Sequence, residues 1–497
     1  AITVRALDEA KTETLAAANG GAAAGAVLVA ETHAHTATAV DAGGTLDAAD
    51  KNIELKANRV DLTDGSLTGK TVVIEATDTI TQANTEKSAV RASDKASFTV
   101  GTAGKAGGSI QLLSEKNTFG KADVRAADEA AGLIGNVDLV TNAASGLTVN
   151  FGAGSAGTLK VKGSAENPLD VRVKNIAENQ SLTLEGKLQT LDTDMAFTSG
   201  GSLTLKSGAE YTSARNMALT AQEDVTLESG AKLDAENLRL KAGKSVFAAG
   251  PLQINGSIAA EGKDIEMKQK VTAGKDLTLT GTNSLTTEAE ISAANITLAG
   301  GDVTVQKEAK AGNNLTLTGG NVTTQKKVNA GSNLTMTAAN SLMTADRLTA
   351  ANITLTAVNN LTTEAELLAD QKLTLTGGDV TTHKKVTAGN DMTLTGTNSL
   401  TTADEVSAAN ITLTGGDITT AKTVNARNDL TMTAANSLKA ADKLTAGGNI
   451  AASSANGNID ITAAEAKGGI DLKAANGKLT VEVLQAQGSI AAAGKDV

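Results

Sequence analysis

The amino-acid sequence predicts an all-β fold: a right-handed, single-stranded parallel β-helix (a solenoid) with about 19–20 residues in each coil. Three observations lead to this prediction. A five-residue motif recurs at nearly constant spacing through the C-terminal half of the chain. Apolar residues alternate with threonine inside the motif. Aromatic residues make up only 1% of the chain and glycine supplies 50 of its 497 residues, which suits a thin core with many tight turns.

The motif consists of Asn or Asp, an apolar residue, Thr, a second apolar residue and usually a second Thr. Its copies follow one another at intervals of 19 or 20 residues, which is the length expected for one coil. We expect the first apolar residue of each copy to form a buried ladder: Leu277, Ile296, Leu315, Leu334, Ile353, Leu373, Met392, Ile411, Leu430 and Ile450.

The alternation inside the motif indicates β-strand. In residues 315–318 the order is Leu-Thr-Leu-Thr, and a period of two places leucine on one face and threonine on the other. Each repeat also contains a second short strand, as at 303–305, and a third, as at 327–329, separated by glycine- and asparagine-rich turns. One such coil cannot bury its own apolar face, so we expect successive coils to stack.

The repeat spacing divides the chain into four regions. Residues 1–45 show little pattern and are predicted to form an N-terminal cap or atypical segment. Residues 46–275 contain strand patterns at irregular spacing, which predicts coils of varying length. Residues 276–450 are predicted to form regular 19-residue coils, and residues 451–497 coils with a period of about 20 residues.

Composition and charge narrow the function classes. The net charge of −11 without a basic block argues against nucleic acid as a partner, because an acidic protein repels phosphates. The absence of cysteine excludes disulfides and thiolate metal sites. No apolar run is long enough for a transmembrane helix. We find no cofactor motif and expect no cofactor.

The C-terminal repeats resemble those of filamentous-haemagglutinin-like adhesins of Gram-negative bacteria. The matching residues are the Asn/Asp-Leu-Thr-Leu-Thr ladder and the segments 448–450, 457–461 and 468–472, with the sequences GNI, GNIDI and GGIDL. The resemblance covers about residues 50–497 and is best over 276–497. It implies a secreted or surface-exposed passenger, exported through an outer-membrane transporter by two-partner secretion or as an autotransporter. The Asn-Pro-Asn-Gly motif of the family's secretion domain is not found, so the export route stays open.

Threonines on the outward face of the motif are candidate surface contacts: Thr316, Thr318, Thr335, Thr337, Thr354 and Thr356. A flat Thr-x-Thr array resembles those of ice-binding β-solenoids. The simpler interpretation, which we favour from the sequence, is that threonine is β-branched and polar and therefore suits a solvated strand. Ala299 interrupts the array.

Asparagines precede the motif at one position of successive coils: Asn295, Asn314, Asn333 and Asn352. Stacked amides can hydrogen-bond along the coil axis, so we expect a structural ladder. Each is also an Asn-x-Thr sequon, which leaves glycosylation as the alternative.

Two further chemistries are weighed and disfavoured. Glu31, His33 and His35 could together bind a metal on one strand face, but no fourth ligand is visible and we favour an exposed loop or edge. Acidic residues such as Glu288, Glu290, Glu364 and Glu366 are scattered over turns and are interpreted as solvated charges. No nucleophile–base pair is found, so we expect no enzymatic activity.

The expected function is therefore the structural and adhesive shaft of a secreted bacterial surface adhesin that attaches cells to a surface or to one another. Its partner would be a host or bacterial surface glycan or protein, or a second copy of the chain. One alternative is a self-assembling extracellular fibre subunit. The other, disfavoured, is a glycan-processing β-helix enzyme, which the fold alone would not justify.

Overall fold

The computed structural model describes residues 3–7, 12–14, 39–48, 52–153, 157–162 and 171–495. All regular secondary structure in these residues is β-strand, and almost all strand pairs are parallel and stacked coil upon coil, which confirms the predicted β-solenoid. No helix that could span a membrane occurs in the described residues. The chain divides into two compact units, unit 1 (Ala1–Lys263) and unit 2 (Asp264–Val497).

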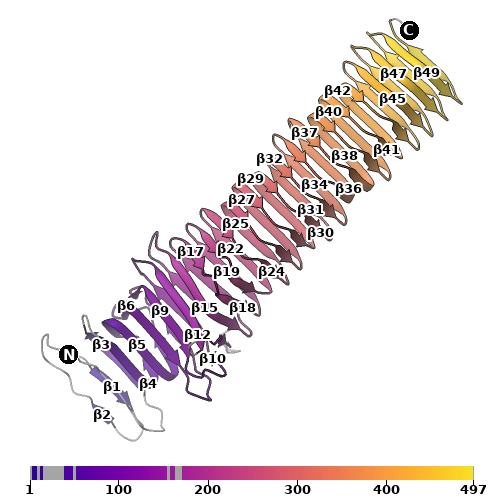
Figure 1. Cartoon of the computed structure of the whole chain (residues 1–497). Helices are drawn as coiled ribbons and strands as arrows, with labels where there is room; N and C mark the ends of the chain where they lie inside the picture. Colours follow the sequence, from indigo (N-terminus) through magenta and orange to yellow (C-terminus); the bar gives the residue numbers. More distant parts are fainter. Residues whose placement is uncertain are drawn as a thin grey trace. The chain divides into compact units, whose positions relative to one another are not determined.

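Unit 1 begins with a small antiparallel arrangement, in which β1 pairs with β2 and β3, and continues with parallel strands (Figure 1). Its strands are β1 (Thr3–Leu7), β2 (Thr12–Thr14), β3 (Ala39–Asp47), β4 (Ile53–Asp61), β5 (Gly65–Gln82), β6 (Ala89–Val100), β7 (Ile110–Leu112), β8 (Thr118–Phe119), β9 (Lys121–Ala126), β10 (Leu133–Ile134), β11 (Val137–Thr141), β12 (Leu147–Ala153), β13 (Leu159–Val161), β14 (Val171–Asn175), β15 (Leu182–Thr190), β16 (Met195–Ser199), β17 (Leu203–Leu205), β18 (Glu210–Ser213), β19 (Asn216–Ala221), β20 (Val225–Leu227), β21 (Lys232–Asp234), β22 (Asn237–Ala242), β23 (Ser245–Ala248), β24 (Leu252–Ile254) and most of β25 (Ile258–Met267).

Coils of unit 1 differ in length, as the irregular spacing predicts. Val171, Met195, Met217, Leu238 and Ile258 lie opposite one another in turn, so successive coils contain 24, 22, 21 and 20 residues. The step from Leu147 to Leu182 is longer still, at 35 residues. The register of the paired strands is kept across these differences in coil length.

The core of unit 1 contains large aromatic side chains. Phe151, Phe197 and Tyr211 are buried and meet with ring centroids 5.5–6.4 Å apart. Phe98 and Phe119 form a second edge-to-face pair at 5.7 Å. The hydroxyl of Tyr211 donates to the carbonyl of Glu185 at 3.0 Å, which satisfies the polar end of a fully buried ring. Longer coils enclose a wider interior, and these rings fill it.

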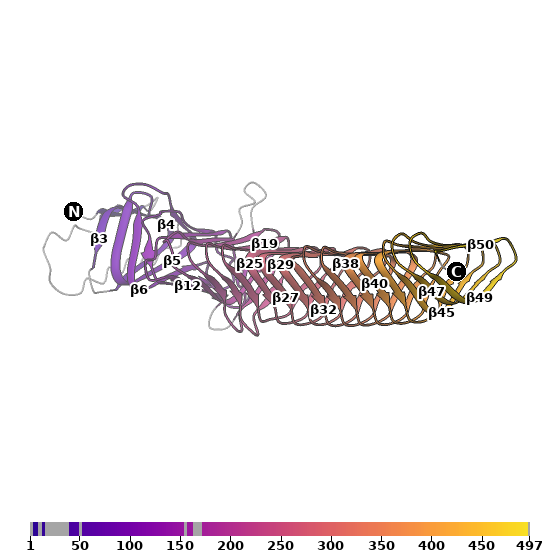
Figure 2. The same ribbon diagram turned by 90° about the horizontal axis from the view of Figure 1, so that it is seen from above.

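Unit 2 begins at Asp264 and has coils of nearly uniform length. In the view from above its coils are seen as a regular series, one beside the next (Figure 2). After the end of β25 its strands are β26 (Val271–Ala273), β27 (Asp276–Thr287), β28 (Ile291–Ala293), β29 (Asn295–Val305), β30 (Ala309–Ala311), β31 (Leu315–Gly319), β32 (Asn321–Thr324), β33 (Val328–Ala330), β34 (Asn333–Ala338), β35 (Leu342–Thr344), β36 (Leu348–Ala357), β37 (Asn360–Thr363), β38 (Leu367–Thr382), β39 (Val386–Ala388), β40 (Asp391–Thr402), β41 (Val406–Ala408), β42 (Asn410–Thr420), β43 (Val424–Ala426), β44 (Leu430–Ala434), β45 (Leu438–Ala446), β46 (Ile450–Ser454), β47 (Ile459–Ala466), β48 (Ile470–Ala474), β49 (Leu479–Ala486) and β50 (Ile490–Ala493).

The coils of unit 2 build three columns of paired strand segments, and the last strand, β50, belongs to the first column alone. The first column begins at Leu277, the second at Leu285 and the third at Val271. In several coils the first two segments join into one long strand with a bulge, as between Gly281 and Ser284 in β27 and between Gly396 and Ser399 in β40. At about 4.8 Å per coil, the twelve rungs from Leu277 to Ile490 extend for roughly 50 Å.

Aliphatic side chains from the three columns form the core of unit 2, which contains no aromatic residue. The ten residues of the predicted ladder lie opposite one another in unbroken sequence, and none is more than 1% exposed. Burying each such side chain contributes about 1.5–3 kcal/mol. The same ladder repeated on every coil therefore stabilises the whole stack.

Candidate functional site

The most regular surface of the molecule lies on the first column of unit 2. Over nine coils the two outward positions of this column are occupied by threonine, with Ala299 as the single exception. We call this surface the threonine array; its members are Thr278, Thr280, Thr297, Thr316, Thr318, Thr335, Thr337, Thr354, Thr356, Thr374, Thr376, Thr393, Thr395, Thr412, Thr414, Thr431 and Thr433. All six threonines singled out from the sequence belong to it, and each is exposed or half-exposed.

The threonine hydroxyls of the array have no hydrogen-bond partner among the described residues. No charged side chain occupies either outward position in these nine coils. The array is thus a neutral surface on which every hydroxyl is available to solvent or to a ligand. Threonine is β-branched and rotates little about χ1, so these hydroxyls are held in a fixed pattern.

The asparagine column borders the array at the start of each strand. Asn295 donates from Nδ2 to Asp276 Oδ1 at 2.9 Å, and Asn314 to Asn295 at 3.4 Å. Asn333 and Asn352 continue the chain of hydrogen bonds at 2.9 and 3.0 Å. The structure therefore brings the four predicted asparagines together as one amide ladder. Lys372 takes the next position and ends it.

Charged residues of unit 2 gather on the turn before the third column. Ion pairs join neighbouring coils there: Lys270 to Glu290 at 3.3 Å, Arg347 to Glu366 at 3.8 Å, and Lys385 to Glu405 at 3.0 Å. His383 lies 3.7 Å from Glu364. These side chains are all well exposed, so each pair contributes about 0–1 kcal/mol. Some of the acidic residues that the sequence predicts to be solvated, such as Glu290 and Glu366, therefore form ion pairs with basic residues of neighbouring coils.

Shallow hollows occur on the described residues of both units. Lys56 and Glu75 line the first, and Lys56 also contacts Glu54 at 2.9 Å and Glu75 at 3.3 Å. Hydrogen bonds to Glu54 and then Glu75 raise the pKa of the Lys56 ammonium, so this lysine stays charged. Lys270, Glu290 and Lys310 are among the residues that line the second hollow. Neither arrangement pairs a nucleophile with a base.

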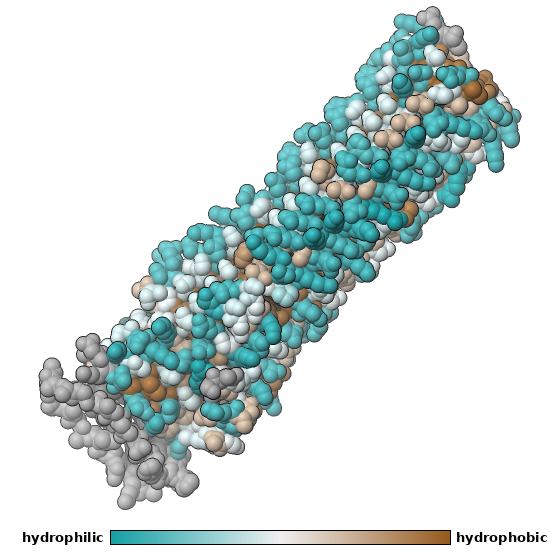
Figure 3. All heavy atoms as spheres, in the orientation of Figure 1, coloured by the Kyte–Doolittle hydropathy of each residue, from teal (hydrophilic) through white to brown (hydrophobic). Residues whose placement is uncertain are grey.

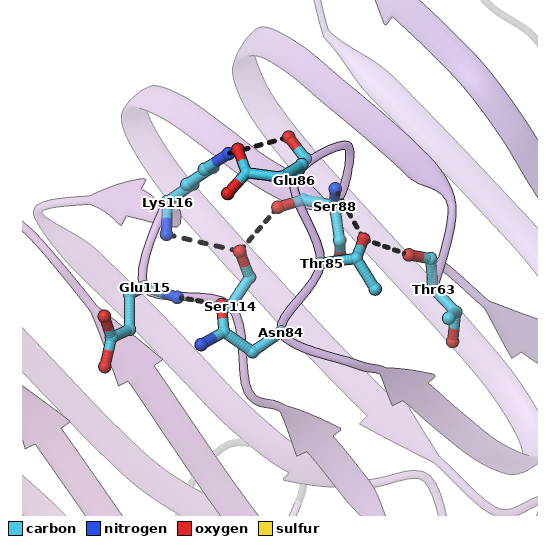
Figure 4. A network of polar contacts seen from close by, with 8 residues as sticks. All are labelled: Thr63, Asn84, Thr85, Glu86, Ser88, Ser114, Glu115 and Lys116. Atoms are coloured by element: carbon cyan, nitrogen blue, oxygen red, sulfur yellow. Dashed lines mark hydrogen bonds and ion pairs between the residues drawn. The ribbon is translucent and has the colours of Figure 1, made fainter.

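A polar network in the turns of unit 1 has a structural role (Figure 4). Thr85 donates to the carbonyl of Thr63 at 2.7 Å, and Ser114 donates to the carbonyl of Ser88. Lys116 bridges to the carbonyl of Glu86 at 2.7 Å and pairs with its carboxylate, which lowers the pKa of Glu86 through that hydrogen bond. Because most of its bonds end on backbone groups, the network fixes the turns and leaves little donor capacity for a ligand.

A buried amide pair that the sequence analysis missed is joined to this network by the Ser114 N–H, which donates to Gln82 Oε1 at 3.3 Å. Asn117 and Gln82 exchange hydrogen bonds at 2.9 and 3.1 Å, and Asn117 Oδ1 accepts the backbone N–H of Val90 at 2.7 Å. Both side chains are at most 2% exposed. Gln82 ends strand β5 and Asn117 lies 35 residues later, in the turn before β8, so no local pattern marks the pair.

A column of buried threonines in unit 2 was also missed. Their hydroxyls have no hydrogen-bond partner, and the side chains are fully buried in the second column: Thr287, Thr324, Thr344, Thr363, Thr382, Thr402 and Thr420. Val305 occupies the equivalent position in its coil. A signal was present, because a Leu-Thr-Thr segment with period two must turn its second threonine inward.

No group of three His, Cys, Asp or Glu side chains suited to a metal occurs in the part of the chain that the structure describes. Glu31, His33 and His35 lie outside the described residues. Comparison with known proteins adds no relative: no protein-family model, curated protein or solved structure matches the chain.

Proposed function

We propose that this chain is the structural and adhesive shaft of a secreted bacterial surface adhesin, without enzymatic activity. The observation that carries the proposal is the in-register stack of unit 2, in which twelve rungs repeat one cross-section. Such a stack transmits one surface pattern over roughly 50 Å, because each coil adds about 4.8 Å. Repetition of this kind suits a spacer and a multivalent contact surface.

The threonine array supplies the contact surface in this proposal. It is neutral, regular and available for hydrogen bonding, whereas the charged residues of the same coils lie mainly on turns. The face of unit 2 seen in Figure 3 is mainly hydrophilic, with apolar atoms in separate spots. Contact through the array would therefore rely on many weak polar contacts in parallel, which together give strong attachment.

Attachment by cells that display the full chain tests this function. We expect a non-adherent bacterium to gain attachment to abiotic or cellular surfaces, or cell–cell aggregation, when it displays the protein. A variant with Thr335→Lys and Thr354→Lys should lose most of the gain at equal display. Absence of any gain would contradict the proposal. Filaments of purified protein under negative stain would favour a fibre subunit, and turnover on a glycan panel would favour an enzyme.

A further inference from the structure

Three Asn-Gly pairs lie in turns that the structure describes: Asn255-Gly256 in unit 1, and Asn456-Gly457 and Asn476-Gly477 in unit 2. Asn-Gly is a chemically labile sequence, because the backbone nitrogen of glycine can attack the side-chain amide of the asparagine before it. Glycine permits this attack most readily, since it has no side chain and restricts the backbone least. All three asparagines are exposed. The reactivity of each pair therefore depends on how its turn is held.

Hydrogen bonds hold the first two of these turns. The Gly457 N–H donates to the carbonyl of Asn436, in the preceding coil, at 2.9 Å and also to Ser454 Oγ at 3.3 Å. The Ser454 hydroxyl donates in turn to the carbonyl of Gly457 at 2.9 Å. The Gly256 N–H likewise donates to the carbonyl of Glu236, one coil earlier, at 2.8 Å. In both turns the nitrogen that would attack is already engaged.

The turn at Asn476 is held differently, because Ala474 lies opposite Ser454 and supplies no hydroxyl. The Gly477 N–H has no hydrogen-bond partner among the described residues, although Gly477 is buried. An unpaired buried N–H costs free energy. The Asn476 side chain makes one hydrogen bond, from Nδ2 to the carbonyl of Ala455 at 2.9 Å. That bond is solvent-exposed and leaves the backbone nitrogen of the glycine unengaged.

We propose that Asn476 is a site of spontaneous deamidation and that Asn456 is protected from it. The deprotonated nitrogen of Gly477 attacks Asn476 Cγ, a C–N bond forms and ammonia leaves, which gives a cyclic succinimide. Water then opens the ring to aspartate or isoaspartate, so the reaction needs no cofactor and no enzyme. The imide nitrogen carries no hydrogen, so ring closure removes the unpaired donor at Gly477. At Gly457 the same step would break two hydrogen bonds.

Deamidation at this position changes the coil that carries it. Asn476 lies in the turn before β49, which pairs in register with β47, with Leu479 opposite Ile459. Isoaspartate routes the backbone through the side chain and adds one carbon atom to that turn. The added atom displaces β49 along β47, although the inward positions of stacked strands depend on their register. We therefore expect the amides of β49 to exchange hydrogen faster after deamidation.

Peptide mass spectrometry of the purified full chain, aged at mildly alkaline pH, tests the proposal. We expect native Asn476 to deamidate at least about tenfold faster than native Asn456 or Asn255, because a bonded N–H must first be released by local opening. In denaturant the three pairs should react at similar rates, since the fold no longer protects any of them. Isoaspartate-specific enzymatic methylation identifies the product.

A reciprocal exchange isolates the role of the serine hydroxyl. Ser454→Ala should accelerate deamidation at Asn456, and Ala474→Ser should slow it at Asn476, because the hydroxyl is moved from one turn to the other. Circular dichroism confirms that each variant folds. Equal rates at the three pairs in the native wild-type chain would overturn the inference. So would an intact native Asn476 when the denatured chain reacts, and rates that ignore the exchange would overturn the role given to Ser454.

Discussion

Units 1 and 2 solve the same packing problem with different residues. Unit 1 has coils of 19 to 35 residues, encloses aromatic rings and pairs most of its buried polar groups. Unit 2 keeps its coils near 19 or 20 residues, uses aliphatic ladders and leaves a column of buried hydroxyls unpaired. Where the coil length varies, as in unit 1, the core needs particular side chains such as the aromatic rings and the buried amide pair. Where the coil length is constant, as in unit 2, an aliphatic residue at each inward ladder position is enough.

We expect the largest loss of stability when a ring is removed from the aromatic cluster of unit 1. Phe197→Ala removes a ring that contacts Phe151 and Tyr211, and it should destabilise unit 1 by about 3–5 kcal/mol. Hydrogen exchange of unit 1 amides measures the change. Phe247→Ala, at a half-exposed ring, is the control and should cost far less. Equal costs would show that the cluster has no special role.

The buried amide pair should show the next largest effect. Asn117→Ala leaves Gln82 Nε2 and the Val90 N–H without a partner, which should destabilise unit 1 by about 2–3 kcal/mol. Denaturant unfolding followed by circular dichroism measures the loss. Asn84→Ala serves as control, because Asn84 is exposed and accepts a single backbone hydrogen bond from Glu115. A loss no greater than that of the control would contradict the assignment.

In unit 2, removal of a buried polar group should raise the stability, whereas in unit 1 it lowers the stability. Thr363→Val replaces a buried, unpaired hydroxyl with a methyl group of similar volume and should stabilise unit 2 by about 1 kcal/mol. Val305 already occupies the same position in another coil. The thermal midpoint measures the gain, and Thr362→Val on the outward side should shift it little. A lower midpoint for Thr363→Val would mean that the hydroxyl is paired in solution.

These three experiments bear on what sequence can predict. The ladder from Leu277 to Ile450 was predictable because the coils have a nearly constant length. Residues one repeat apart in the sequence are therefore the residues that lie opposite one another in the stack. The strand pairing in unit 1 could not be predicted from the sequence. Its coils differ in length, as the 35-residue step from Leu147 to Leu182 shows, so the repeat spacing does not reveal which residues lie opposite one another. The asparagine ladder and the threonine array follow from position in the repeat. The Asn117–Gln82 pair depends on the end of β5 meeting a turn of the next coil in space, which no local pattern encodes.

The smallest expected difference between the units is in how their stability changes when the pH is lowered. Hydrogen bonds from Lys232 and then Lys187 lower the pKa of Glu210 from its ordinary 4.5, and Lys206 first does the same for Glu228. Their stabilisation is therefore complete above about pH 4.5 and is lost as pH falls through the lowered folded-state pKa. In unit 2 the pKa of Asp417 is lowered chiefly by hydrogen bonds from Ser437, which are neutral.

Thermal midpoints between pH 7 and pH 3, in low and high salt, test this difference. High salt should weaken the acid dependence of unit 1 because it screens exposed ion pairs. The contribution of Asp417 should persist in high salt, since its partner carries no charge. Glu210→Gln should flatten the pH profile of unit 1, and Asp417→Asn that of unit 2. Identical salt responses in both units would contradict the interpretation.

The two long bulged strands β27 and β40 have a genetic consequence. Their sequences are nearly the same, starting at Asp276 and Asp391, and both carry the bulge at equivalent glycines. Exchange between the two DNA segments that encode them would remove 115 codons, which correspond to six whole coils from Leu277 to Met392. The reading frame, the leucine ladder and the turn sequence would all continue across the junction. A gene built in this way can therefore shorten or lengthen its product in complete coils, without passing through a misfolded intermediate length.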